Sequence, residues 1–331
     1  MLGIRRREFI TALGSAAVAW PTLARAQQDG RVRRIGILDV GDETDRLVQT
    51  RQSVLREGLA KLGWIEGRNV RFDLRFSTDP DRLRAQTDEL VRPAPDVIAV
   101  STLPATRLVL QRTRTIPIVF TNVGDPVAVG LLKNIARPEG NVTGATTLYE
   151  SIAGKWLELL KEAAPHTARL ALIFAVEIVA ENYFAVLDTA ADVLGVKAIR
   201  TPYRNAAELE RAIDAFAAEP NGGLLMVPPP PSGINRELIN RLALKYRLPT
   251  IYSNKYVGPA DGGMMSYGGD SVEPFRITAS YVDRVLRGAK ISDLPVQFPT
   301  KFELVINLKT AKAIGLDLPA FLLQRADEVI E

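Results

Sequence analysis

Short runs of mostly apolar residues alternate with longer stretches of helical period along most of the 331-residue chain. In the stretch 50–64, Val54, Leu55, Leu59 and Leu62 recur at helical spacing and the charged residues fall at other positions. This alternation is typical of βα units built around parallel sheets. The predicted strands cover residues 35–40, 70–76, 96–101, 116–121, 169–174, 196–201, 223–227 and 248–252.

Two turn-rich segments divide these strands into groups. The segment "RPEGNVTG" (137–144) follows the first four strands, and "GPADGGMMSYGGD" (258–270) follows the next four. The strands are nearly continuous apolar runs, which indicates parallel sheets covered on both faces. We therefore predict an α/β fold with two Rossmann-like lobes, each with a parallel sheet, joined by a hinge.

The last part of the chain makes both predicted lobes discontinuous. A helix is predicted over 273–288, and a strand with a short helix over 299–315. This order implies that the chain crosses between the two lobes and back, so that each lobe is built from separate pieces of the sequence. The predicted boundaries are 33–145 plus about 271–297 for lobe 1, and 146–270 plus about 298–331 for lobe 2.

The N-terminal segment differs from the rest of the chain. It has a basic start at residues 5–7, an apolar stretch over 9–20 that is too short to span a bilayer, and small residues at Ala24 and Ala26. We predict that residues 1–26 are a twin-arginine-type signal peptide that directs the protein to the periplasm. The alternative, an amphipathic surface helix, would lack a charged face.

Charge and cysteine content narrow the function classes. Residues 1–26 carry four arginines and one glutamate, a net of +3 out of the chain's +4, which leaves +1 for the rest. The basic balance therefore belongs to the signal segment and indicates no nucleic-acid partner. The chain has no cysteine, so disulfides, a thiol nucleophile and a lipid-anchor cysteine are excluded.

Most enzyme motifs are missing from the sequence. Five residues separate Gly124 from Gly130 and no Lys-Ser/Thr pair follows, unlike a P-loop, and no G-x-G-x-x-G follows the first predicted strand. The single histidine, His166, lies in a linker, and no G-x-S-x-G elbow is present. Zinc catalysis usually needs several His or Cys ligands. A hydrolase that uses carboxylates alone remains open.

Polar residues after the predicted strands are candidates for ligand binding. Ligands bind beyond the carboxyl ends of the strands in open α/β sheets, and two facing sheets place both sets of loops on one cleft. Ser, Thr, Asn and Asp at strand-to-helix turns are helix N-caps first and ligand contacts second, and Asp125 before Pro126 would cap a helix that begins with proline. The candidates are Asp42, Thr44, Ser101, Thr102, Thr106, Asn122, Asp125, Glu181, Asn182, Ser232, Tyr252, Ser253 and Asn254.

Four segments carry a family resemblance. Residues 116–144, 262–270 ("GGMMSYGGD"), 294–319 and 322–331 ("LLQRADEVIE") resemble the substrate-binding components of ABC importers of the TrpX-like "ABC substrate binding" family. The resemblance implies a type I periplasmic-binding-protein fold that closes on a small molecule and presents it to a permease with a cytoplasmic ATPase. We expect a monomer with no cofactor, no metal site and no catalytic residue.

The sequence departs from the family pattern at loops where the ligand would be chosen. These loops read "VGDETD" (40–45), "AVEIVAEN" (175–182) and "VPPPPSG" (227–233). The acidic first loop indicates a ligand with a positive group, such as the ammonium of an amino acid, while Ser101 and Thr102 would take its carboxylate. We expect a small polar ligand: an amino acid, with aromatic ones included, or a related organic acid. A ligand-sensing regulator is disfavoured because no DNA-binding helices precede Arg34.

Overall fold

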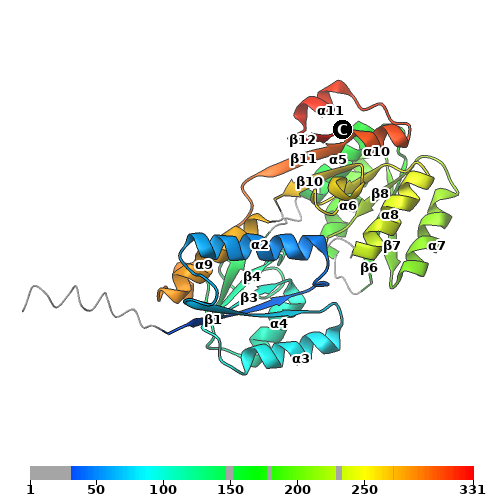
Figure 1. Cartoon of the computed structure of the whole chain (residues 1–331). Coiled ribbons are helices and arrows are strands. Elements are labelled where there is room, and N and C mark those ends of the chain that lie inside the picture. Colours follow the sequence, from blue (N-terminus) through cyan, green and yellow to red (C-terminus); the bar gives the residue numbers. More distant parts are fainter. Residues whose placement is uncertain (1–30, 147–151, 177–180, 229–232, 271) are drawn as a thin grey trace, which may run out of the picture.

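The protein contains two separate sheets, each covered by helices on both faces (Figure 1). The computed structural model describes residues 31–146, 152–176, 181–228, 233–270 and 272–331. The predicted signal segment 1–26 lies outside these residues. We call the five-stranded sheet with its helices the first unit, and the seven-stranded sheet with its helices the second unit.

The first unit has a fully parallel sheet in the order β2-β1-β3-β4-β5. Its strands are β1 (Arg33–Asp39), β2 (Val70–Phe76), β3 (Val97–Ser101), β4 (Ile118–Thr121) and β5 (Val142–Ala145). One face packs against α2 (Arg46–Lys61) and α9 (Glu273–Leu286). The opposite face packs against α3 (Pro80–Val91) and α4 (Leu103–Arg112). This is the doubly wound arrangement that the apolar strands predict.

The second unit has a mixed sheet in the order β12-β11-β10-β9-β8-β6-β7. Its strands are β6 (Arg169–Ala175), β7 (Lys197–Tyr203), β8 (Gly222–Met226), β9 (Thr250–Tyr252), β10 (Met265–Gly269), β11 (Phe302–Asn307) and β12 (Glu328–Ile330). The prediction of a parallel sheet is wrong at one place, because β10 and β11 pair antiparallel. The chain leaves the second unit after β10 and re-enters it as β11, so these two strands have no βαβ connection to make them parallel.

Helices cover both faces of this sheet as well. One face packs against α5 (Ala153–Ala163), α6 (Glu181–Leu194), α10 (Leu308–Ala313) and α11 (Ala320–Arg325). The other face packs against α7 (Ala206–Ala217) and α8 (Gly233–Lys245). Two short 3₁₀ helices, η2 (Pro259–Asp261) and η3 (Ile291–Asp293), complete the described elements.

The chain passes between the two units three times. It leaves the first sheet after β5, returns after β10 to form α9, and leaves again to form β11. Thr146 donates its backbone N–H to Gln297 O at 3.0 Å, and Gln297 donates to Gly144 O at 3.0 Å, so the first and third passages run side by side. The predicted boundaries near 145, 271 and 297 stay predictions.

Helix α9 is a late segment that completes an early core. Phe275 and Val282 join the buried cluster formed by Ile35 and Leu59. Gly58 permits the close approach of α2 to α9, because a Cβ at this position would lie 2.7 Å from the Ala279 Cβ. The first unit therefore needs residues from both ends of the chain.

All eight predicted strands are present, and the helix over 273–288 and the strand and helix within 299–315 are confirmed. Three further strands were missed. β5 overlaps the end of the predicted turn 137–144, and β10 lies within the predicted turn 258–270. Both contain glycine, which the sequence pattern assigns to turns, and here the sheet needs it for close packing. The third, β12, is three residues long.

Candidate functional site

The carboxyl ends of the first unit's strands bring three polar side chains together. Asp39 ends β1 and is only 1% exposed. The Ser101 hydroxyl donates to Asp39 Oδ1, and Gln52 Nε2 donates to Asp39 Oδ2 at 3.2 Å. The Val40 backbone N–H donates to Ser101 Oγ at 3.2 Å. These bonds compensate the burial of the Asp39 carboxyl group and fix Ser101 at the end of β3.

The residues at the ends of β3 and β4 combine unusual backbone angles with hydroxyl groups that have no partner. Thr102 has φ 73° and Asn122 has φ 54°, a region that non-glycine residues seldom adopt. Thr102 donates its N–H to Thr121 O at 2.9 Å, which ties the two strand ends together. Among the described residues, the buried Oγ1 atoms of Thr102 and Thr121 have no hydrogen-bond partner. Strain and unsatisfied hydroxyls at one sheet edge are typical of a binding site.

The second unit contributes Ser253 at the end of β9. Its side chain is 2% exposed, and its Oγ has no hydrogen-bond partner among the described residues. The preceding Tyr252 belongs to the core: it is 1% exposed and donates its hydroxyl to Asn240 Oδ1 at 2.5 Å. Burial raises the pKa of Tyr252. Asn254 accepts a hydrogen bond from the Val257 N–H at 3.3 Å.

Five charged residues lie where the two units meet, and we call them the interlobe cluster: Asp39, Asp45, Arg51, Arg236 and Asp261. Arg236 of α8 is 7% exposed and forms ion pairs with Asp261 at 2.6 Å and with Asp45 at 3.8 Å. Asp45 is the N-cap of α2, so the second ion pair joins the first unit to the second.

An apolar contact accompanies this ion pair. Leu47 of α2 belongs to the same buried cluster as Ile239 and Leu242 of α8. Figure 1 shows α2 on the side of the first unit that faces the second unit. The start of α2 is therefore a contact between the two units.

Arg51 is the member of the cluster that has no hydrogen bond or ion pair among the described residues. Within the described residues its guanidinium donates no hydrogen bond, and no carboxylate lies within ion-pair distance of it; its Nε is buried. The guanidinium carbon lies 5.6 Å from the ring centre of Phe275. Burial lowers the pKa of Arg51, against the opposing effects of Asp39 and Asp45 and with a smaller contribution from Arg236.

Several predicted site residues are engaged in local contacts. Asp42 Oδ1 accepts from the Thr44 N–H at 2.8 Å and from the Thr44 hydroxyl at 2.6 Å, and both side chains are exposed. These bonds lower the pKa of Asp42. Thr106 is fully buried and donates to Thr102 O at 2.7 Å. Their contact with ligand stays a prediction.

The prediction of a capped helix start at Asp125 is wrong in part. Asp125 Oδ1 accepts from the N–H groups of Val127 at 2.8 Å and Ala128 at 3.0 Å, as a cap would. Residues 126–130, however, form turns and no helix. The nearby Gly130 has φ 70°, which ends any helical continuation.

Three candidates of the second unit cannot be placed. Ser232 and the side chains of Glu181 and Asn182 lie outside the described residues.

The sequence reasoning missed the importance of Asp39, Asp45, Arg51 and Arg236. Charges inside an amphipathic helix are usually solvent-facing, so Arg51 and Arg236 gave no signal of their own. The spacing Leu47–Arg51–Leu55 was available, and it places Arg51 between two apolar residues on one face of the helix.

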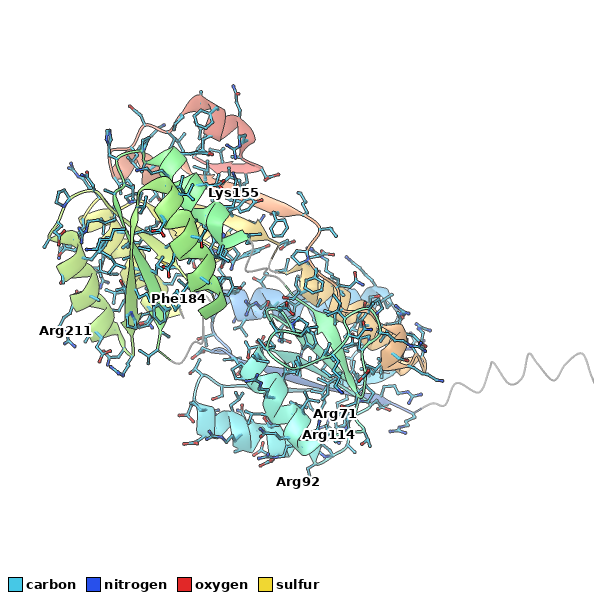
Figure 2. All side chains as sticks on the ribbon, turned by 180° about the vertical axis from the view of Figure 1, so that it is seen from behind. Arg71, Arg92, Arg114, Lys155, Phe184 and Arg211 are labelled. Carbon is cyan, nitrogen blue, oxygen red and sulfur yellow. The ribbon has the colours of Figure 1, made fainter. Side chains whose placement is uncertain are left out.

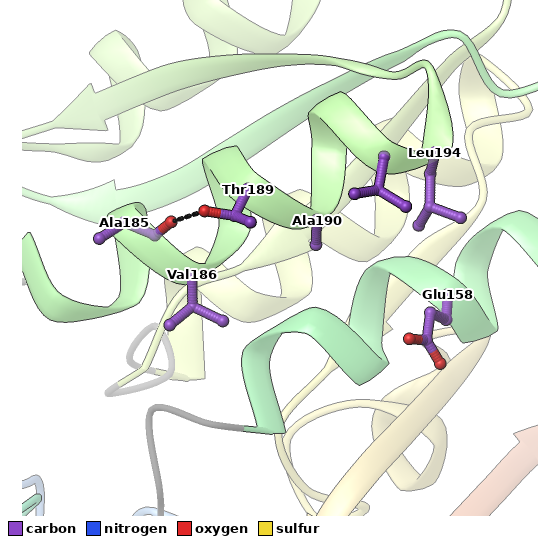
Figure 3. A pocket seen from close by; sticks show the side chains of 7 residues that line it. Glu158, Ala185, Val186, Thr189, Ala190 and Leu194 are labelled. Atoms are coloured by element: carbon purple, nitrogen blue, oxygen red, sulfur yellow. Dashed lines mark hydrogen bonds between the residues drawn. The ribbon is translucent and has the colours of Figure 1, made fainter.

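Other surface features lie away from these strand ends. Figure 3 shows an apolar groove between α5 and α6, lined by Glu158, Val186 and Leu194, where the Thr189 hydroxyl donates to Ala185 O at 2.9 Å. In Figure 2, the labelled arginines Arg71, Arg92 and Arg114 lie on the first unit, on the side away from the second. Among the described residues, no group of three or more His, Asp or Glu side chains is placed to hold a metal ion.

Comparison with known proteins decides the family. The model of the family "ABC transporter substrate binding protein" matches residues 40–330. The chain belongs to this family. It is therefore a substrate-binding protein of an ABC transporter.

Individual relatives agree with this assignment. The chain is 25% identical over 269 residues to a "Tyrosine-binding protein" of Clostridioides difficile, covering 78% of this chain and 75% of that protein. A conserved domain protein from Vibrio cholerae superposes with a TM-score of 0.81 at 25% identity, covering 90% of this chain and all of that one.

A third relative is a solved structure described as an ABC domain in complex with L-Trp from Streptococcus pneumonia. It has a TM-score of 0.81 at 21% identity and covers 90% of this chain and 99% of that one. These likenesses confirm the type I periplasmic-binding-protein fold.

The family fits a protein that works outside the cytoplasm, because ABC substrate-binding proteins are typically extracytoplasmic. None of the helices in the described ranges has the length and apolar character to cross a bilayer.

Proposed function

We propose that this protein is the periplasmic component of an ABC importer. It captures a small polar ligand, an amino acid or a related organic acid, between its two units and delivers it to an inner-membrane permease that is driven by a cytoplasmic ATPase. In this proposal residues 1–26 are the twin-arginine-type export signal, and the mature protein acts as a monomer.

The observation that supports this proposal most directly is the set of unsatisfied hydroxyls at the strand ends of both units. Thr102 directly follows β3 and Thr121 ends β4 in the first unit, and Ser253 directly follows β9 in the second. A buried hydroxyl without a partner in the protein destabilises the folded state, and a bound ligand can supply the missing bond. A polar ligand that bonds to both sets holds the two units together.

The relatives support an amino-acid ligand. One relative is named for tyrosine binding, and another was solved with L-Trp. For the present chain we propose an aromatic amino acid as the first ligand to test.

The mechanism follows from differential affinity. A ligand that contacts both units binds the closed arrangement more tightly than an open one, and so shifts the population towards closure. The three passages between the units, near 145, 271 and 297, would serve as the hinge.

A thermal-shift screen of the mature protein against the common amino acids and small organic acids tests the proposal. A ligand that binds only the folded state raises the unfolding midpoint, and we expect the largest increases with tryptophan or tyrosine. Calorimetric titration then gives the affinity. Chromatography after long incubation should recover the ligand unchanged; conversion of the ligand would instead favour the carboxylate hydrolase. A screen in which no amino acid shifts the midpoint would contradict the proposal.

A further inference from the structure

We infer that Arg51 is the residue that binds the ligand's carboxylate, and that the ligand is recognised as an intact α-amino acid with a free carboxyl group. This inference rests on the proposed function, because it concerns the ligand held between the two units.

The first argument is that every other charge in the interlobe cluster has a partner. Asp39 accepts bonds from the Ser101 hydroxyl and the Gln52 amide. Arg236 pairs with Asp261 and Asp45, and Asp45 also accepts the Leu47 N–H at 2.7 Å. Within the described part of the chain, Arg51 alone of the five has neither a hydrogen bond nor an ion pair.

The second argument is the cost of this arrangement. A guanidinium carries five N–H donors and stays charged at neutral pH. Arg51 is half-buried, and enclosing its Nε without an acceptor is unfavourable. The ring of Phe275 compensates part of this cost through a cation–π contact at 5.6 Å. An arginine fork matches the two oxygens of a carboxylate, which makes a carboxylate the natural missing partner.

The third argument is position. Arg51 lies one helical turn after Leu47, which packs into the second unit, and one turn before Leu55, which packs into the first unit's core. The Arg51 side chain therefore lies between the region where the two units are in contact and the buried core of the first unit. Its charge interacts with Asp39, whose partner Ser101 directly precedes the unpartnered Thr102.

The net charge of the interlobe cluster indicates which kind of carboxylic acid it would bind. Its three carboxylates and two guanidinium groups carry a net charge of −1. A simple carboxylate would make this balance more negative, whereas a zwitterion leaves it unchanged and adds an ammonium group near Asp39. The cluster therefore favours an amino acid over the corresponding organic acid.

The test compares acids with their neutral amides. L-Tryptophan, L-tyrosine and their primary carboxamides are titrated calorimetrically into wild-type protein and into the Arg51→Gln and Arg51→Lys variants. Wild type should bind each acid at least about tenfold more tightly than its amide, since a charge-assisted pair is lost in the amide. This preference should fall below about twofold in Arg51→Gln and be intermediate in Arg51→Lys, which keeps the charge but not the fork.

Arg56→Gln is the matched control. Arg56 lies on the same helix, contacts the Phe72 ring at 5.2 Å, and pairs with Glu66 at 3.4 Å. This variant should keep the preference for acids. Without ligand, the unfolding midpoint of Arg51→Gln should equal or exceed that of wild type, because the substitution removes a charge that has no hydrogen-bonded partner.

Three results would overturn the inference while leaving ligand binding intact: equal affinity of wild type for acid and amide, an unchanged preference in Arg51→Gln, or a marked fall in its ligand-free midpoint, which would indicate a structural role. If wild type binds no amino acid at all, the proposed function fails and the inference fails with it. The wild-type comparison of acid and amide requires no variant to fold.

Discussion

At the scale of single residues, the polar groups near the strand ends divide into two classes. Asp39 and Tyr252 are buried and Asn240 is half-buried, and all three make hydrogen bonds through their side chains. The Thr121 and Ser253 hydroxyls are buried without partners among the described residues. The first class holds the scaffold in place, and the second leaves bonds for a ligand to make.

Replacing Tyr252 with phenylalanine tests the first class. The substitution removes the bond to Asn240 Oδ1 and leaves this half-buried acceptor without its donor, so the free energy of unfolding at pH 7 should fall by about 1 kcal/mol. Urea denaturation followed by circular dichroism measures this change. Tyr267→Phe, at a half-buried ring stacked on Phe302, is the control and should be nearly neutral.

The same variant has a consequence at alkaline pH. Because burial raises the pKa of Tyr252 in the folded state, the unfolded state loses its phenolic proton first. The contribution of this group is therefore complete below about pH 10 and decreases as the pH rises further. The stability of Tyr252→Phe should decline less steeply than that of wild type between about pH 9 and pH 11; parallel curves would contradict this account.

Some of these residues could be chosen as site residues from the sequence. Ser101, Thr102 and Ser253 could be chosen because hydroxyls after strands of a parallel sheet lie at the ligand-binding edge. Arg51 and Arg236 could not, because their burial depends on two units meeting, and a helical pattern does not show which charges a second unit covers. Tyr252 was expected at the ligand, and the structure shows its ring in the core.

At the scale of elements, α2 has two roles. Its first turn contacts the second unit through Asp45 and Leu47, and its later turns pack in the first core through Leu55 and Leu59. A displacement of the second unit therefore acts first on the start of this helix.

Two substitutions at Asp45 separate these roles. Asp45→Asn keeps the cap on the Leu47 N–H and removes the charge facing Arg236; asparagine and aspartate are equally good caps. Asp45→Ala removes both and should lower the free energy of unfolding by about 1 kcal/mol more than Asp45→Asn. Chemical denaturation of both variants measures the difference, and equal losses would show that the cap contributes little.

Strand β10 depends on a glycine. A Cβ at Gly268 would lie 1.8 Å from Ser253 O, a backbone atom that cannot move aside without displacing the end of β9. Gly268→Ala should therefore lower the free energy of unfolding by more than about 2 kcal/mol in urea denaturation. Gly124→Ala is the control, because a Cβ there meets no atom within 4 Å. A neutral Gly268→Ala variant would show that the two strand ends separate readily.

This glycine also explains what the sequence could not predict at the element scale. The eight strands rich in β-branched residues were found from their pattern. β10, with the sequence "MSYGG", contains the glycines that normally indicate a turn. The requirement for close packing against β9 arises only in the assembled sheet. The antiparallel pairing of β10 with β11 likewise depends on where the chain re-enters the unit.

At the scale of the whole molecule, Arg236 links the two units. It is nearly buried between Asp45 of one unit and Asp261 of the other. Its removal leaves two carboxylates facing each other across the contact, and their repulsion favours separation of the units.

The Arg236→Gln variant tests this role. Small-angle scattering without ligand should give a larger radius of gyration for the variant than for wild type. At saturating ligand the variant should still have a larger radius of gyration than ligand-bound wild type. Arg241→Gln, at an exposed position of the same helix, is the control and should scatter like wild type. An unchanged radius in Arg236→Gln would show that apolar contacts such as that of Leu47 hold the units without the ion pairs.

The late position of α9 affects how the protein folds as it is made. The ribosome releases β1 to β5 first, but the helix that covers one face of their sheet begins only at Glu273. Until then the apolar surface around Ile35 and Leu59 has no cover from α9, and the nascent chain depends on other contacts or on chaperones to keep it from associating with other chains. The second unit must also wait for β11 and β12. Completion of both cores is thus a late event in synthesis, and a chain truncated before Glu273 would leave each unit unfinished.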